Sequence, residues 1–231
     1  MPLRLLPFAT LIDRLAQLYG EPAPPAVIEP FAMILWENIA YLANDAKRAE
    51  AFEELKATVG LTPKDIRRAK DSVLLVIAGK GIVPENTVQK LRRAAEIARD
   101  SFDDNLAPIL EKSLAAAKMD LRKFPAIGEP AAEKILLFNR RYPVLALESN
   151  GLRVLVRLGY GPEHRNYSTM YKATQRALAA QLPQDCDALI RAHQLLRQHG
   201  QELCKRATPF CTSCPLRPNC AWFGEMAISE K

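Results

Sequence analysis

The sequence predicts an all-α protein. Apolar residues recur at intervals of three and four along most of the chain, which is the spacing of one helix face, whereas the alternating pattern of a half-buried strand is scarce. The chain has 231 residues and is 48% hydrophobic, which is enough for one large core or two modest ones. It has no run of the roughly twenty apolar residues that a membrane-spanning helix needs. We therefore expect a soluble protein with no membrane partner.

The individual helices follow from local signals, taken in chain order. The first segment, 1–18, mixes charged and apolar residues in an amphipathic pattern. A buried helix follows Pro30, with one apolar face formed by Phe31, Ile34, Leu35, Asn38, Ile39 and Leu42. Thr62 and Pro63 mark another helix start, because a capping hydroxyl precedes a proline in the first turn. Further helices are predicted at 45–59, 85–102, 105–117, 130–139, 150–158, 167–182 and 185–199. One group of helices should end, and another begin, near Tyr142 and Pro143.

The charge of the chain suggests a polyanionic partner. The formal net charge is +6. The excess is concentrated in three stretches, namely Lys64, Arg67, Arg68 and Lys70, then Lys90, Arg92 and Arg93, and finally residues 153–176. Such stretches attract nucleic acids. Solvated basic faces are also common in proteins that bind nothing acidic, so the charge alone leaves both interpretations open.

Four of the five cysteines have the spacing C-x6-C-x2-C-x5-C, at Cys204, Cys211, Cys214 and Cys220. Four thiolates in one short loop can surround an iron–sulfur cluster. Zinc is an alternative, although zinc loops usually combine two C-x2-C pairs or include histidine. Disulfides are a third interpretation, but no secretory signal opens the chain, so we expect a cytoplasmic location. Cys186 lies outside the loop and is expected to be an ordinary thiol.

A second motif is the segment Phe124-Pro125-Ala126-Ile127-Gly128-Glu129-Pro130, which should form a hairpin between two helices. Its backbone N–H groups would point outward from a helix N-terminus, which suits one phosphate of a DNA strand. Proline and glycine also mark ordinary helical turns, so the hairpin alone is weak. Glu148 follows eighteen residues after Pro130 and opens the run Ser149-Asn150-Gly151-Leu152-Arg153-Val154, and His199-Gly200 leads into the cysteine loop.

The hairpin, the acid and the cysteine loop, in this order, resemble the helix-hairpin-helix DNA glycosylases, in particular the endonuclease III and adenine glycosylase branch with a C-terminal [4Fe–4S] cluster. The resemblance extends from about Pro30 to Cys220. It implies a six-helix barrel at 22–142, with the helix-hairpin-helix at about 119–140, and an iron–sulfur cluster domain formed by 1–21 and 143–231, with the cluster loop at 204–220. It also implies a [4Fe–4S] cofactor on the four cysteines.

The partner that the resemblance implies is double-stranded DNA with a damaged or mismatched base, held by a monomer in a cleft between the two domains. The implied process is base excision repair, and a prokaryotic protein of this kind would associate with the nucleoid.

The chain departs from the family at the hairpin. The family pattern is L-P-G-V-G-x-K, and its lysine attacks the sugar to form the Schiff base that leads to strand cleavage. Pro130 occupies that position here, and a proline has no nucleophilic side chain. Ala126 replaces the first glycine of the pattern, so we expect a different turn geometry. Adenine glycosylases also lack the lysine, so the resemblance implies a glycosylase without lyase activity.

Two acids are candidate catalytic residues. Glu148 aligns with the family aspartate, which stabilises the oxocarbenium-like sugar or activates water. Its alternative role is that of a solvated acid near the start of the helix at Asn150. Glu37 matches a glutamate with which adenine glycosylases protonate the departing purine, and we expect a raised pKa for an acid in an apolar helix. Its alternative role is a surface position on an amphipathic helix.

Other DNA contacts are expected by position. The hairpin would contribute Ala126, Ile127, Gly128 and Glu129, and the resemblance places apolar wedges at Leu42 and Ile82, where they would fill the gap left by an extruded base. Lys134 is expected to be solvated or to contact a phosphate. The cysteine loop would present Arg206 to the DNA.

Three functions are compatible with the sequence. The first is a monofunctional DNA N-glycosylase that flips a base and hydrolyses its glycosidic bond with Glu148, assisted by Glu37. The second is an iron–sulfur protein that binds DNA lesions without chemistry. The third is a lyase that cleaves abasic DNA with an amine other than the missing lysine.

Overall fold

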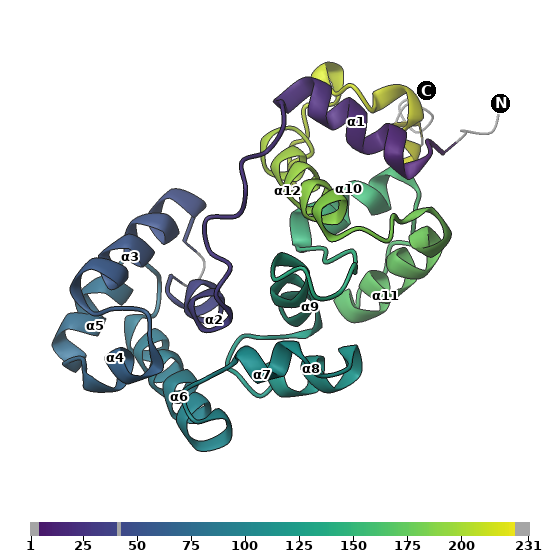
Figure 1. The fold of residues 1–231 in the computed structure, drawn as a ribbon. Coiled ribbons are helices and arrows are strands. Elements are labelled where there is room, and N and C mark those ends of the chain that lie inside the picture. The colour runs from purple at the N-terminus through teal and green to yellow at the C-terminus, as the bar shows by residue number, and fades with distance from the viewer. Residues whose placement is uncertain (1–4, 41–42, 225–231) are drawn as a thin grey trace. The chain divides into compact units, whose positions relative to one another are not determined.

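The computed structural model describes residues 5–40 and 43–224. Within these residues every regular element is a helix, which confirms the all-α fold class. None of the helices there is long and apolar enough to cross a membrane. The chain forms two compact units, one made of Met1–Pro24 and Pro143–Lys231 and the other of Pro25–Tyr142. Figure 1 shows the path of the chain through both.

The first unit combines the N-terminal helix with the C-terminal part of the chain. Its elements are α1 (Phe8–Tyr19), α10 (Ser149–Leu158), α11 (Tyr167–Leu178), the short 3-10 helix η1 (Ala179–Gln181), α12 (Cys186–Glu202), η2 (Cys211–Ser213) and η3 (Arg217–Asn219). Both α1 and α10 pack on α12 (Figure 1). The core includes the fully buried Leu11, Leu15, Leu152, Leu155, Leu189, Leu195 and Leu196.

The close packing of α10 on α12 depends on Gly200. A Cβ atom at this position would lie 2.6 Å from the carbonyl oxygen of Asn150 and 2.7 Å from its Cβ. Both distances are shorter than any normal contact, and one neighbour is backbone. Glycine at this position therefore allows the start of α10 to lie directly against the last turn of α12.

The second unit contains eight helices among its described residues. They are α2 (Pro30–Asn38), α3 (Asp45–Thr58), α4 (Pro63–Arg68), α5 (Asp71–Ala78), α6 (Pro84–Phe102), α7 (Ala107–Leu110), α8 (Leu114–Leu121) and α9 (Glu129–Phe138). The long helix α6 packs against α2, α4 and α5. The core is aliphatic and aromatic, with Phe31, Ile34, Leu35, Leu55, Leu74, Ile77, Leu91, Ile135 and Leu136 buried.

The single helix predicted over 105–117 is wrong, because two helices, α7 and α8, occupy this region. The Asn105 side chain accepts a hydrogen bond from the N–H of Ala107 at 3.0 Å, so the first helix starts late. Ser113 then accepts from the N–H of Ala116 at 3.5 Å and caps α8. The helical pattern of apolar residues continues across the break, but the two capping side chains divide it.

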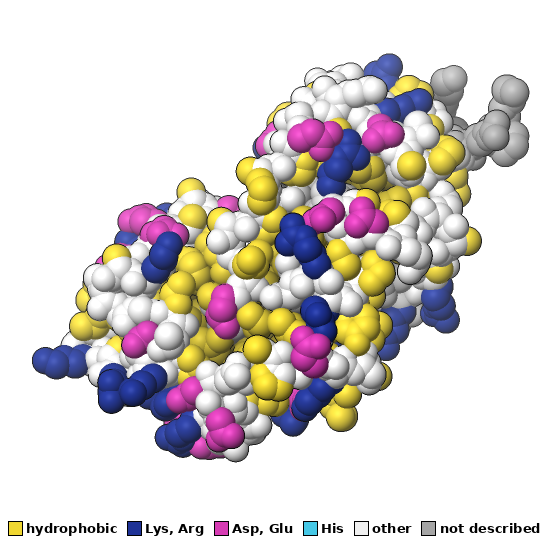
Figure 2. All heavy atoms as spheres, viewed as in Figure 1, with side chains coloured by type: hydrophobic (Ala, Val, Ile, Leu, Met, Phe, Trp, Pro, Cys, Tyr) yellow, Lys and Arg dark blue, Asp and Glu magenta, His cyan; other side chains and the backbone are white. Residues whose placement is uncertain are grey.

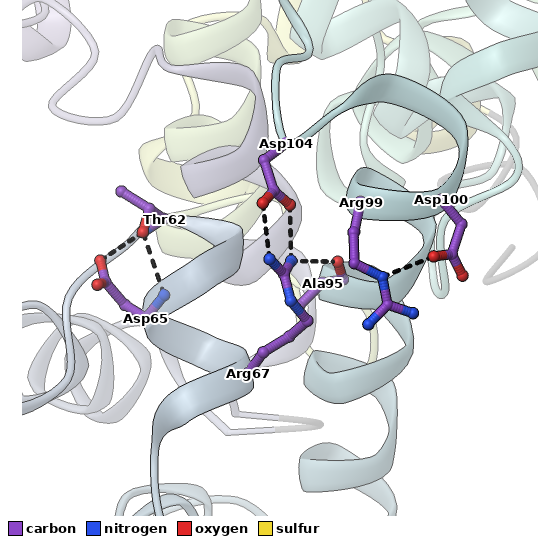
Figure 3. Close-up of polar contacts among 7 residues, drawn as sticks. All are labelled: Thr62, Asp65, Arg67, Ala95, Arg99, Asp100 and Asp104. Carbon is purple, nitrogen blue, oxygen red and sulfur yellow. Dashed lines mark hydrogen bonds and ion pairs between the residues drawn. The ribbon is translucent and has the colours of Figure 1, made fainter.

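Two arginines of the basic stretches serve the fold. Arg67 of α4 donates two hydrogen bonds to the Asp104 carboxylate, both of 2.6 Å, and a third to the Ala95 carbonyl at 2.9 Å (Figure 3). The same figure shows the capping box of Thr62 and Asp65, which confirms the predicted start of α4. The hydrogen bonds from Arg67 also lower the pKa of Asp104. Arg67 therefore links α4 to the end of α6.

Arg92 has a similar structural role. Its guanidinium donates to the carbonyls of Ile66 and Ala69, the latter at 2.6 Å, and pairs with Asp71. The face drawn in Figure 2 shows basic and acidic side chains interspersed rather than separated. Residue counts in the sequence therefore overstate the positive charge that these two stretches present to a partner.

Candidate functional site

The cysteine loop folds back on itself after α12. The N–H of Cys204 donates to the carbonyl of His199 at 2.8 Å, and the N–H of Phe210 donates to the carbonyl of Leu203 at 2.9 Å. The short helix η2 begins at Cys211 and ends just before Cys214. The second short helix, η3, ends just before Cys220. All four cysteines are free thiols, which excludes the disulfide interpretation for this structure.

These four cysteines line one cavity. Its empty volume is about 320 Å³, including its opening to solvent, and its other lining residues include Leu203, Pro209, Phe210, Trp222 and Phe223. Among the described residues, no three His, Cys, Asp or Glu side chains converge closely enough to hold a single metal ion. The four cysteines instead line one space together with apolar side chains and the two arginines Arg157 and Arg217, and four cysteines around one space are the ligand set of an iron–sulfide cube. The residues present therefore fit a cluster.

A cationic group, Arg157, donates a hydrogen bond to one of the sulfur atoms. Arg157 donates one N–H to the Cys204 sulfur at 3.4 Å, and its guanidinium also binds the carbonyls of Lys205 and Arg206 and lies 4.6 Å from the ring centre of Trp222. Burial raises the pKa of the Cys214 thiol to about 11. A buried thiol of this kind becomes a thiolate only when a positive charge stabilises it.

The predicted hairpin lies between α8 and α9. Phe124 and Ile127 are buried and anchor it, and the N–H of Ile127 closes the turn on the carbonyl of Phe124 at 3.2 Å. Ala126 and Gly128 are exposed. No side chain caps the start of α9, where Pro130 occupies the first turn. The exposed part of the hairpin is therefore backbone around Ala126 and Gly128, beside the positive end of the α9 dipole.

The hairpin contains a left-handed residue that is not glycine. Ala126 has a φ of 59°, a region that costs an alanine about 1 kcal/mol or more relative to glycine. The carbonyl of the preceding Pro125 accepts a hydrogen bond of 2.9 Å from the buried amide of Asn38 in α2. Neighbouring contacts thus hold this alanine in a strained conformation, and a turn geometry different from that of the family stays a prediction.

We predict that Ala126→Gly stabilises the protein by about 0.5–1 kcal/mol, because the relief of strain exceeds the extra flexibility of glycine in the unfolded chain. Urea denaturation followed by circular dichroism measures this difference. Ala131→Gly is the matched control, since the same change within helix α9 should destabilise by about 0.5–1 kcal/mol. If both variants lose stability equally, the strain at Ala126 is not significant.

Glu148 is the N-cap of α10. One carboxylate oxygen accepts from the N–H of Gly151 at 2.6 Å, and the other accepts from the side-chain amide of Asn150 at 2.8 Å. Burial raises the pKa of Tyr167 to about 12, and the charge of the Glu148 carboxylate contributes to this increase. The Glu148 carboxylate is therefore fixed by two donors and is only partly exposed.

A continuous set of hydrogen bonds connects Glu148 with the cysteine loop. Arg153 donates to the Asn150 side-chain oxygen at 2.8 Å, to the carbonyl of Gly200 at 2.7 Å and to the carbonyl of Cys204 at 2.9 Å. Because Arg153 holds the oxygen of Asn150, the amide nitrogen of that residue must face Glu148. The position of the acid thus depends on the same arginine that fixes the first cysteine.

Glu37 and Lys134 lie in the other unit and form an ion pair between α2 and α9. Their side chains are only 20% and 17% exposed, respectively. Glu37 thus has a cationic partner within the apolar surroundings that the sequence predicted for it. Lys134 is one turn deeper in α9 than Pro130, as the sequence predicted.

The remaining predicted DNA contacts are surface positions or lie outside the described residues. Ile82 is 64% exposed between α5 and α6, and the side chain of Arg206 is exposed in the cysteine loop. Glu129 pairs with Lys118 at 2.7 Å. Leu42, the other predicted wedge, falls outside the described residues.

Sequence reasoning missed Arg157 and the role of Tyr19. Arg157 follows Arg153 by four residues on a helix that precedes the cysteines by about fifty positions, and this i, i+4 spacing of two arginines on one helix face was an available signal. Tyr19 has no local signal, since its hydroxyl meets His199 across 180 positions of sequence.

Comparison with known proteins gives relatives over nearly the whole chain. No protein-family model matches it. The endonuclease III of Thermotoga maritima is 25% identical over 206 residues, which cover 87% of each chain. The endonuclease III of Rickettsia felis is 27% identical over 231 aligned residues, which cover 96% of this chain and 99% of the relative.

The fold has a close counterpart among solved structures. The structure of a trapped endonuclease III–DNA covalent intermediate superposes with a TM-score of 0.75 over 96% of this chain and 100% of that chain, at 18% identity. At this identity the likeness concerns the fold alone. The two sequence relatives and this solved structure are all endonuclease III proteins.

Proposed function

Because the chain belongs to the endonuclease III-like branch of the helix-hairpin-helix DNA glycosylase superfamily, we propose that it is a monofunctional DNA N-glycosylase. Its substrate would be double-stranded DNA with a damaged or mismatched base, bound by a monomer. The observation that carries this proposal is the fixed carboxylate of Glu148, held by Gly151 and Asn150. The sequence resemblance assigns the role of the family aspartate to this residue.

The chemistry assigned to Glu148 is electrostatic and proton-transferring. A carboxylate held in place by two donors needs little reorganisation to stabilise the positive sugar that forms as the base leaves, and it can accept a proton from an attacking water. The extra methylene of glutamate is accommodated because the side chain curls back to cap its own helix. Gly151 lies at the contact, where the space for a Cβ is bounded by Leu196 at 3.3 Å and by the Glu148 carboxylate at 3.6 Å.

Glu37 is proposed as an assisting residue in its ionised form. Its pairing with Lys134 makes it a hydrogen-bond acceptor for an N–H of an extruded base, and protonation of a leaving base would first require separation from the ammonium. The hairpin at Ala126 and Gly128 would bind one phosphate through its backbone, with Ile82 and Arg206 as further DNA contacts.

We further propose that Cys204, Cys211, Cys214 and Cys220 hold a [4Fe–4S] cluster. The support is the single cavity that all four line and the guanidinium of Arg157 at Cys204. Bound there, the cluster would cross-link residues 204–220 into a rigid loop. The exposed Arg206 would then be presented on a fixed backbone, since the carbonyl of this residue is bound by Arg157 at 3.0 Å.

The experiment that tests the proposal is a screen of the purified protein, in excess, against duplexes that each carry one damaged or mismatched base. Products are analysed with and without alkali. A monofunctional glycosylase gives strand scission only after alkaline treatment, because it leaves an intact abasic site. Scission without alkali indicates lyase chemistry from another amine, and Lys134→Ala then tests the nearest candidate.

A second function, recognition of DNA lesions without chemistry, is favoured by one observation. Both carboxylate oxygens of Glu148 already have donors in this structure, as expected of a purely structural cap. Release of no base from any duplex, together with binding to lesion DNA that is the same for Glu148→Gln, would support this function and contradict the glycosylase proposal.

We predict that Pro130→Lys acquires Schiff-base chemistry. The position lies in the first turn of α9, where proline is not required for the helix and lysine is tolerated. With borohydride, the variant should form a covalent adduct with abasic DNA, whereas the natural chain and Pro130→Ala should form none. An adduct with Pro130→Ala would show that a different amine reacts.

A further inference from the structure

A hydrogen-bonded pair of a partly exposed tyrosine, Tyr19, and a buried histidine, His199, ends at one of the four cysteines. The hydroxyl of Tyr19 lies 3.0 Å from Nδ1 of His199, and Nε2 of the same ring lies 3.5 Å from the sulfur of Cys214. His199 is 1% exposed. The rings of Tyr19 and His199 also make an edge contact, with centres 6.0 Å apart.

The direction of these hydrogen bonds follows from the chemistry of a metal-bound cysteine. A thiolate ligand has no proton, so Nε2 must be the donor toward Cys214. A neutral imidazole carries one proton, and Nδ1 is then an acceptor. The tyrosine hydroxyl is the donor that Nδ1 requires, so Tyr19 selects the tautomer in which His199 donates to the sulfur.

We propose that Tyr19 and His199 are positioning residues that tune the cluster through Cys214, an inference that rests on the proposed cluster site. A hydrogen bond to a ligand sulfur stabilises the additional negative charge of the reduced cluster, and hydrogen bonding of this kind is one of the features that set the reduction potential. Since Tyr19 belongs to α1 and Cys214 to the C-terminal loop, the pair also makes the N-terminal helix part of the cluster environment.

The donor at Cys214 differs in kind from the donor at Cys204. Cys204 receives the guanidinium of Arg157 at 3.4 Å, which is a charged and partly exposed donor. Cys214 receives a donor from a ring that is almost fully buried, where a hydrogen bond is less weakened by water. Removal of the His199 donor at Cys214 should therefore affect the reduction potential more than removal of the partly exposed Arg157 donor at Cys204.

The test compares the reduction potential of the cluster in four variants with that of the natural chain. His199→Leu removes the donor and should shift the ratio of reduced to oxidised cluster about tenfold toward the oxidised form at a fixed potential, equivalent to about 59 mV for one electron. Tyr19→Phe removes only the hydroxyl and should shift the ratio in the same direction by less. His199→Gln, whose amide can still donate, should recover part of the shift.

Tyr160→Phe is the matched control, because this buried tyrosine donates its hydroxyl to the carbonyl of Leu6 in the same unit. It should leave the potential unchanged. Unchanged potentials in both His199→Leu and Tyr19→Phe, or a shift in Tyr160→Phe equal to that in Tyr19→Phe, would overturn the inference while the cluster proposal stands. Failure of the natural chain to bind iron and sulfide would overturn both.

Discussion

Substitution of Glu148 by glutamine is expected to reduce base release by about 10²–10⁴-fold. The change removes the negative charge that the proposed reaction requires. It also places the new glutamine amide opposite the side-chain amide of Asn150, which donates to Glu148 in the natural chain. Asn150 cannot turn to accept from this new donor, because Arg153 binds its oxygen at 2.8 Å. Single-turnover release of base from the duplex identified in the screen measures the loss.

The control for this prediction is Asp185→Asn. Asp185 is the N-cap of α12 in the same unit, and its carboxylate accepts from the N–H groups of Asp187 and Ala188, both at 3.2 Å. The variant loses the same charge at the same kind of helix position. It should lose about 1 kcal/mol or less of stability and retain base release. Equal losses of activity in the two variants would contradict a catalytic role for Glu148.

Glu148→Asp separates the requirement for charge from the requirement for position. Aspartate is a better N-cap than glutamate and restores the residue type of the family at this position. If the carboxylate is catalytic, the aspartate variant should release base much faster than the glutamine variant. A rate as low as that of Glu148→Gln would mean that the longer side chain is needed to reach the substrate.

The parts of the structure that the sequence predicted are those with local causes. Helix positions follow from apolar spacing and caps, as at Thr62 and Asp65, where the capping box depends on four consecutive residues. The cysteines were recognisable because their ligand spacing lies within one loop. The break at Ser113 was missed because a single capping hydroxyl outweighs a helical pattern that continues on both sides.

The parts that the sequence could not predict depend on contacts between distant residues. The pairing of Glu37 with Lys134 joins positions 97 residues apart, so no local signal indicated that this acid has a cationic partner. Glu148 had two interpretations, a dipole-stabilised acid and a catalytic one. The structure shows the cap through Gly151, and the catalytic role stays a prediction.

Substitution of Arg153 by leucine is expected to destabilise the first unit by about 3–5 kcal/mol. The guanidinium is only partly exposed, and burial lowers its pKa. It is the donor for the side-chain oxygen of Asn150 and for the carbonyls of Gly200 and Cys204. Leucine leaves these three acceptors without this partner. Hydrogen bonds to a charged group contribute about 1.5–3 kcal/mol each, so the loss of three of them in a partly exposed site accounts for a change of this size.

The same substitution should also impair two properties that lie at opposite ends of the hydrogen-bond chain. Without Arg153, the Asn150 side chain can rotate, so the donor to Glu148 is no longer fixed and base release should fall by about tenfold or more in the folded fraction. The carbonyl of Cys204 also becomes unanchored, so the cluster should be lost to a chelator faster than in the natural chain.

Arg176→Leu is the matched control, because Arg176 is an exposed arginine of α11 that donates only locally to the carbonyl of Lys172, at 3.2 Å. Denaturation, base release and chelator-induced loss of visible absorbance together test whether one arginine couples the acid to the cluster loop. A variant that is destabilised but has normal base release and normal cluster retention would restrict Arg153 to a structural role.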